Sequence, residues 1–134
     1  MSPRTLSPAL DMGAIYFFLV ALVHTIGWHV PGLFIFFDVP SQAFQDQIIG
    51  LLAFGWALWL AESARRCRVD PKASIVPVLV AGVVAIVALA RIVLLTTLPT
   101  STPSTNWYWV QIGVLAAYVT LLAAASRARS TRAR

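Results

Sequence analysis

The sequence has few charged side chains, one cysteine and two histidines among its 134 residues. Charged residues make up 11% and hydrophobic residues 59%, a balance far from that of a soluble globular domain. The single cysteine, Cys67, excludes an internal disulfide and an internal thiol–disulfide cycle. Long apolar stretches fill the chain instead, so the expected solvent is a lipid bilayer.

Four apolar stretches predict four membrane-spanning helices. They cover approximately residues 8–31, 42–64, 71–96 and 106–126. A hydrocarbon core about 30 Å thick needs about 20 apolar residues for each helical crossing, so four crossings with short loops use nearly the whole chain. We therefore predict an all-α integral membrane bundle that forms a single domain over residues 1–134.

Local signals predict where these helices begin and end. Ser7 and Ser41 precede the first two stretches as caps, and Asp70-Pro71 is typical of the start of the third. Pro31-Gly32 breaks or kinks the first helix, and the apolar segment 33–37 either extends that helix or lies in the membrane interface. We interpret the first stretch as a retained anchor and not a signal peptide, because no small-x-small cleavage site follows it.

Basic residues outside the stretches predict the orientation. Arg4 precedes the first stretch, and four arginines follow the fourth. Four basic residues, Arg65, Arg66, Arg68 and Lys72, lie between the second stretch and the apolar run of the third. The other two loops carry none, so both termini are expected on the cytoplasmic side of a bacterial inner (plasma) membrane. Topology and anionic membrane lipids account for the net charge of +5, and no nucleic-acid recognition module accompanies it.

Polar side chains inside the stretches predict a polar layer in the outer half of the membrane. Its members are His24, His29, Asp46, Arg91 and Gln111. At 1.5 Å of rise per residue, the last three lie at comparable depth, whereas His24 lies about 7.5 Å deeper than His29. Three interpretations of Arg91 stay open: it snorkels to the interface, it pairs with Asp46 to fix the packing, or it belongs to a ligand or ion site.

Metals and cofactors are not expected. In a continuous helix, two histidines five residues apart project about 140° from each other, so one ion would not bind both without distortion. Ligation of haem by two histidines needs imidazoles on facing helices, and both histidines lie in one stretch. Cys67 stands among arginines, where it is open to reactivity or palmitoylation, although a lone thiol in a short loop is usually incidental.

Small residues repeat every four positions in three of the stretches and predict close helix packing. These residues are Ala53, Ala57 and Ala61, then Ala81 and Ala85, then Gly113 and Ala117.

No spacing of residues in the sequence matches a catalytic motif. We predict a noncatalytic accessory or assembly subunit, with membrane lipids and a second copy or a larger membrane complex as partners. The alternative is a small transporter or binding protein for an anionic or amphipathic ligand, which would use the polar layer.

Two segments carry a family resemblance. The segment 45–50, Gln-Asp-Gln-Ile-Ile-Gly, enters the second stretch, and Ala90-Arg91-Ile92 stands late in the third. Together they resemble small four-helix bacterial membrane proteins of the DoxX-like type and their uncharacterised relatives, over most of the chain. The resemblance implies the four-helix architecture and a role for Asp46 and Arg91, and it implies no reaction. The chain lacks the glycine-rich first helix of DoxX itself.

Overall fold

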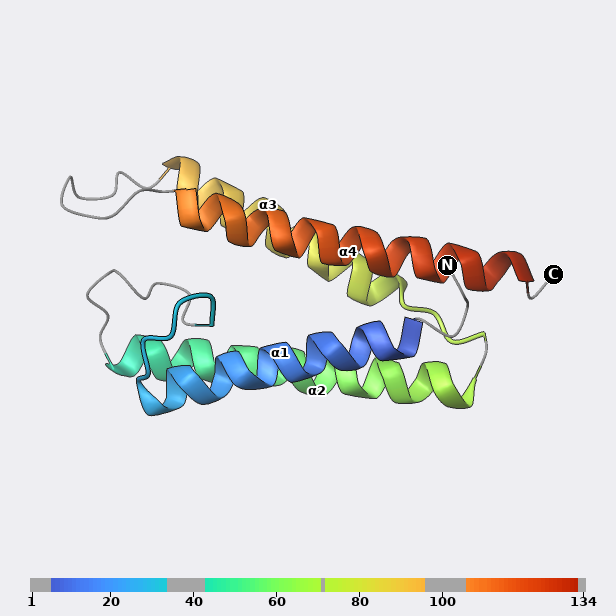
Figure 1. The fold of residues 1–134 in the computed structure, drawn as a ribbon, viewed down its shortest axis with the longest axis horizontal. Helices are drawn as coiled ribbons and strands as arrows, with labels where there is room; N and C mark the ends of the chain where they lie inside the picture. Colours follow the sequence, from blue (N-terminus) through green and yellow to red (C-terminus); the bar gives the residue numbers. More distant parts are fainter. Residues whose placement is uncertain (1–5, 34–42, 71, 96–105, 133–134) are drawn as a thin grey trace. The chain divides into compact units, whose positions relative to one another are not determined.

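The computed structural model describes residues 6–33, 43–70, 72–95 and 106–132. Within these ranges the chain is all-helical, with α1 (Leu6–Ile26), α2 (Ala43–Val69), α3 (Val76–Leu95) and α4 (Asn106–Arg132) (Figure 1). Each of these helices is long and apolar enough to span a membrane. The predicted all-helical fold class is therefore confirmed for the part of the chain that the structure describes.

α1 ends at Ile26, five residues before the predicted end at 31. Gly27 has φ of +78°, and the amides of Gly27 and Trp28 both donate to the carbonyl of Val23, each over 2.9 Å. This is a glycine C-cap, in which a left-handed residue turns the chain away from the helix axis. The predicted end was wrong, because Gly27 and not Pro31 terminates the helix.

Pro31 and Gly32 form a tight turn after α1. The amide of Leu33 donates to the carbonyl of Val30 over 3.1 Å, and Gly32 has φ of +84°. Proline followed by a left-handed glycine fits a type II turn. The hydroxyl of Tyr16 donates to the carbonyl of Gly32 over 2.9 Å, so the segment folds back along α1. Of the segment 33–37, only Leu33 lies within the described residues.

α2 continues to Val69, beyond the predicted end at 64. Glu62 forms ion pairs with Arg65 and Arg66, at the i+3 and i+4 positions that support a helix. A charged last turn can thus remain helical. The predicted cap of this helix, Ser41, lies outside the described residues.

The predicted caps of the first and third helices were wrong. Ser7 lies inside α1, which begins one residue earlier. Asp70 accepts a hydrogen bond from the amide of Lys72 in a local turn, and α3 begins only at Val76, whose amide donates to the hydroxyl of Ser74. The short side chain of Ser74 is close enough to the first turn to bond its amide, whereas Asp70 is six residues away.

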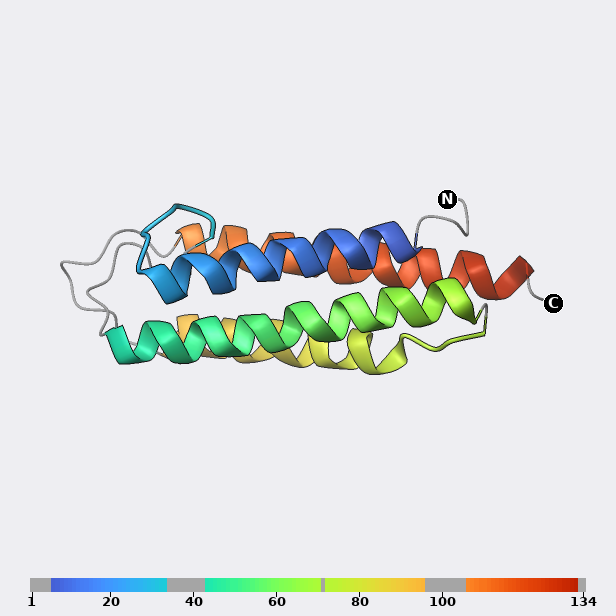
Figure 2. The same ribbon diagram turned by 90° about the horizontal axis from the view of Figure 1, so that it is seen from below.

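The described part of the chain divides into two compact units, residues 7–69 and residues 70–132 with Leu6. In the first unit, α1 and α2 run antiparallel and side by side (Figures 1 and 2). In the second unit, α3 packs on α4. A Cβ at Gly82 would lie 2.6 Å from Cγ2 of Val119, so the two helices touch where residue 82 has no side chain.

The predicted small-residue faces have different environments. Ala53 and Ala57 are buried, whereas Ala61 is exposed. On α4, Gly113 and Ala117 are exposed, and no described atom lies within 4 Å of the position of a Cβ at Gly113. The small face of α4 is therefore distinct from the surface that Val119 presents to α3.

Candidate functional site

The candidate site lies between α1 and α2, where small residues let the two backbones approach closely. A Cβ at Gly50 would lie 3.2 Å from the carbonyl oxygen of Ala21 and 3.4 Å from Cβ of His24. One turn further along α2, Ala53 packs in a buried cluster with Val20 and Ala21. This contact fixes α1 against α2 at the level of His24.

The antiparallel register of α1 and α2 continues from that contact toward the start of α1. Phe17 stacks on Trp56, with ring centroids 5.8 Å apart and an angle of 21° between the ring planes. The hydroxyl of Ser7 donates to the carbonyl of Ala64 over 3.3 Å. Contacts closer to the start of α1 thus involve residues closer to the end of α2, as expected for an antiparallel pair. The two helices stay in contact over most of the length of α1.

His24 and Asp46 meet at one end of this pair of helices. His24 lies in the last turn of α1 and Asp46 in the first turn of α2. The distance from Nδ1 of His24 to Oδ1 of Asp46 is 3.7 Å, and the side chains are 0% and 10% exposed. An imidazole facing a carboxyl can hold a proton on either partner. Both residues belong to the polar layer predicted from the sequence, but their pairing with each other was not predicted.

His29 lies outside the helix in which it was predicted. It belongs to the segment that follows the Gly27 cap, and its side chain is exposed. The separation of about 140° expected between His24 and His29 in a continuous helix therefore does not apply. The structure separates the exposed histidine from the buried one by a turn of the backbone.

Arg91 and Gln111 belong to the second unit, on α3 and α4. Starting from the contact between Gly82 and Val119, Arg91 lies nine residues along α3 and Gln111 eight residues back along α4, about 13.5 Å and 12 Å of rise. The two residues are thus level with each other in this pair of helices. Arg91 is exposed and Gln111 is half-buried. The pairing of Arg91 with Asp46 stays a prediction, because the two residues lie in different units.

A second polar cluster joins α1 to α2 at the opposite end from His24. Nη1 of Arg68 donates to Oδ2 of Asp11 over 2.6 Å and to the hydroxyl of Ser7 over 2.9 Å. The sequence predicts Ser7 only as a cap, so this cluster was not among the predicted sites. The antiparallel pairing of the two stretches was the signal that could have found it.

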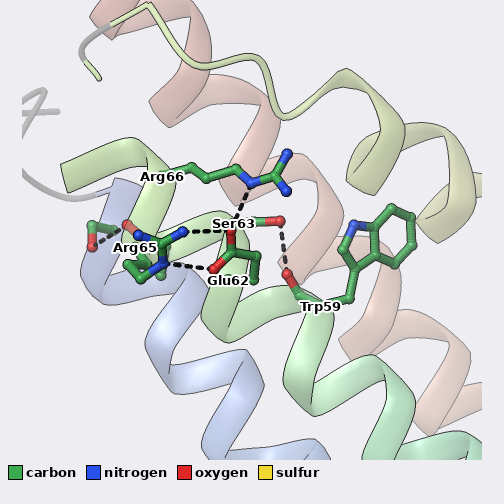
Figure 3. Close-up of polar contacts among 7 residues, drawn as sticks. Trp59, Glu62, Ser63, Arg65 and Arg66 are labelled. Carbon is green, nitrogen blue, oxygen red and sulfur yellow. Dashed lines mark hydrogen bonds and ion pairs between the residues drawn. The ribbon is translucent and has the colours of Figure 1, made fainter. Parts of the chain in front are cut away.

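Glu62 pairs with two arginines on the same helix (Figure 3). Its carboxylate accepts hydrogen bonds from Nε and Nη2 of Arg65, over 2.7 and 2.9 Å, and from Nε of Arg66, over 2.8 Å. These side chains project from the last turns of α2, where the two arginines are exposed and Glu62 is half-buried. The two arginines and one glutamate leave a local charge of +1, so the basic character of this end is reduced.

A series of aromatic rings lies midway along α1 and α2. Besides the stack of Phe17 on Trp56, Tyr16 meets Phe17 edge-on at 5.5 Å, and Trp56 meets Trp59 at 5.3 Å. Neighbouring rings in such contacts add to the packing of the two helices. The rings of these four residues therefore form a continuous series of contacts across α1 and α2.

Cys67 is a half-buried thiol near the end of α2. Within the described residues, no group of three or more His, Cys, Asp or Glu side chains is placed to hold a metal ion.

Comparisons of the chain with family models, with curated proteins and with solved structures gave no match. The resemblance to DoxX-like proteins stays a prediction. The helices nevertheless indicate the class of protein. In the part of the chain that the structure describes, α1, α2, α3 and α4 each have the length and apolar character expected of a multi-pass membrane protein.

Proposed function

We propose that this chain is a noncatalytic, multi-pass protein of a bacterial inner membrane that acts as an accessory or assembly subunit of a membrane complex. The lengths of the helices support insertion. The 20 residues of α3 rise about 30 Å, the thickness of a hydrocarbon core. The 27 residues of α2 rise about 40 Å, enough for its arginine-bearing end to reach the headgroups.

Both termini face the cytoplasm in this proposal. Support comes from Arg129, whose guanidinium donates to the backbone carbonyl of Asp70. This bond places the end of α4 beside the connection that precedes α3. Two basic segments of the sequence thus lie at the same end of the α3–α4 pair, as the positive-inside rule requires of segments on one side of a membrane.

The observation that carries the proposed accessory role is the exposed face of α4 around Gly113. No described atom lies within 4 Å of the position of a Cβ there, and Ala117 is exposed one turn further along. Small residues four positions apart let a neighbouring membrane helix approach the backbone closely. Because α3 contacts α4 through Val119 instead, the Gly113 face is suited to a helix of a partner or of a second copy.

Cross-linking in native membranes, followed by affinity purification of the tagged chain, tests this proposal. We expect a partner or a second copy to be recovered with the wild-type chain and with the control Val114→Leu, which enlarges the next exposed residue. Gly113→Leu should lose it while retaining the helical circular dichroism spectrum. Recovery of the wild-type chain alone and monomeric would contradict the proposal.

A second candidate function is the binding of a small anionic or amphipathic ligand at the polar layer. Two observations favour it: the buried pair of His24 and Asp46, and the common level of Arg91 and Gln111. Decanoate is a suitable probe, because it combines a carboxylate with an apolar chain. We expect it to raise the unfolding temperature of the wild-type chain and not of Arg91→Leu. Equal stabilisation of both proteins would contradict a site at Arg91.

A further inference from the structure

The pair of His24 and Asp46 is the most deeply buried ionisable contact between α1 and α2 that the structure describes. Nδ1 and Oδ1 are 3.7 Å apart, with side chains 0% and 10% exposed. The nearby Gly50 lets the two helices come close enough for the pair to form. A lone charge at this depth would be costly, and an apolar pair would fill the same space without that cost. The two residues thus call for an explanation beyond packing.

Other ionisable groups near the pair are few. Within the described residues of the first unit, His29 is the next such group after His24, and it is exposed. Asp11 lies thirteen residues back along α1 and Glu62 sixteen residues along α2, about 20 Å and 24 Å away by helical rise. Among the described ionisable groups of α1, α2 and the segment after α1, Asp46 is therefore the charged group that faces His24.

We propose that His24 and Asp46 form a proton-binding site that fastens this end of α1 to α2. The occupied site holds one proton, either on the imidazole as a cation facing the carboxylate or on the carboxyl facing a neutral ring. In both forms the pair is neutral overall. Loss of the proton to water leaves a carboxylate facing a neutral imidazole, with a net charge of −1. That charge is stable only if water enters, so release of the proton is coupled to separation of the two helix ends.

This proposal does not rest on the accessory role, and it uses the same pair as the polar-layer ligand without requiring that ligand. The ligand of this site is the proton. Binding of the proton makes the contact between these ends of α1 and α2 depend on the pH of the solution on that side of the membrane. The opposite cluster of Arg68, Asp11 and Ser7 is exposed and contains no histidine, so it does not share this behaviour near neutral pH. The α1–α2 pair thus has a proton-binding contact at one end and a solvent-exposed ion pair at the other.

Nitrogen-15 NMR of the full chain in lipid nanodiscs, labelled at histidine, tests the proposal directly. The chain has two histidines, so His29→Gln assigns the ring signals of His24. In the wild-type chain we expect a titration of the His24 ring, with the amides around Gly50 shifting over the same pH range. In Asp46→Asn, we expect the titration of the His24 ring to change, because the facing carboxylate is one of the two groups that share the proton.

Two results would overturn the proposal. One is a set of His24 ring nitrogen signals that does not change from pH 4.5 to pH 9 in the wild-type chain, because gain or loss of the proton on either partner would alter the ring or its contact with the carboxyl group. This measurement needs no variant. The other is a titration that is identical in the wild-type chain and Asp46→Asn. Asp11→Asn is the matched control, since it removes a carboxylate from the far end of the same pair of helices and should leave the His24 titration unchanged.

Discussion

Gly82 of α3 and Val119 of α4 are in such close contact that a Cβ at residue 82 would lie 2.6 Å from Cγ2 of Val119. We expect Gly82→Ala to destabilise the protein by about 1–3 kcal/mol, because the added methyl group forces the two helices apart. The measurement is the free energy of unfolding in mixed micelles, with SDS as the denaturant.

Val119→Ala supplies the control for this contact. It removes the methyl group that a Cβ at residue 82 would meet, so the double variant with Gly82→Ala should be more stable than the sum of the two single effects predicts. Simple additivity would show that Val119 is not what excludes a side chain at residue 82.

Gly50 and Gly55 on α2 allow a matched comparison of the same substitution. A Cβ at Gly50 would lie 3.0 Å from the hydroxyl oxygen of Thr25 and 3.2 Å from the carbonyl of Ala21, whereas no described atom lies within 4 Å at Gly55. We expect Gly50→Ala to cost about 1–3 kcal/mol. Gly55→Ala should be neutral or gain up to about 1 kcal/mol from helix propensity. Equal effects in the same micelle assay would argue against the contact at Gly50.

The sequence predicted the helices well and their ends less well, for a physical reason. Each apolar stretch is long because a membrane crossing requires the length, and many residues contribute to that signal. An end depends on one or two residues. Gly27 ends α1 through its left-handed φ, and the stronger-looking signal at Pro31-Gly32 forms a separate turn. In the same way Ser74 and not Asp70 bonds the first turn of α3.

For the candidate site, the sequence predicted how deep each polar residue lies in the membrane, but it did not predict which residue faces which. Positions along each stretch placed Asp46 near one end of its helix, but they do not give the direction in which a side chain points. Gly50 follows Asp46 by four residues, and Ala21 precedes His24 by three, so each small residue shares a helix face with its ionisable neighbour. This pattern was the available signal for the pair of His24 and Asp46.

The hydrogen bond from Tyr16 to the carbonyl of Gly32 fastens the turn after α1, and its removal should loosen that turn. We expect Tyr16→Phe to speed hydrogen exchange of the Leu33 amide, which donates to Val30 within the turn. The expected loss is about 0.5–1.5 kcal/mol, the usual net contribution of one such bond. Thr120→Val is the control, because its hydroxyl bonds only within α4. Unchanged exchange at Leu33 in Tyr16→Phe would show that the turn holds without this bond.

The contact between Arg68 and Asp11 should contribute little to stability despite its short distance of 2.6 Å. Both side chains are more than one third exposed, so solvent screens their attraction. A double-mutant cycle with Asp11→Asn and Arg68→Gln should give a coupling energy of about 1 kcal/mol or less in low salt, and less still in high salt. A coupling of several kcal/mol, insensitive to salt, would mean that this end of the α1–α2 pair is shielded from water.

The proposed orientation predicts opposite labelling of the two ends of the helices. Cys67 is the only cysteine, so Cys67→Ser gives a background without thiols. In that background, His29→Cys places a thiol after α1 and Thr131→Cys places one near the end of α4, both at exposed positions. Because the proposed orientation puts the basic segments in the cytoplasm, an impermeant maleimide should label His29→Cys on intact cells. Thr131→Cys should react only after the cells are permeabilised, and reaction of both thiols on intact cells would rule out the orientation.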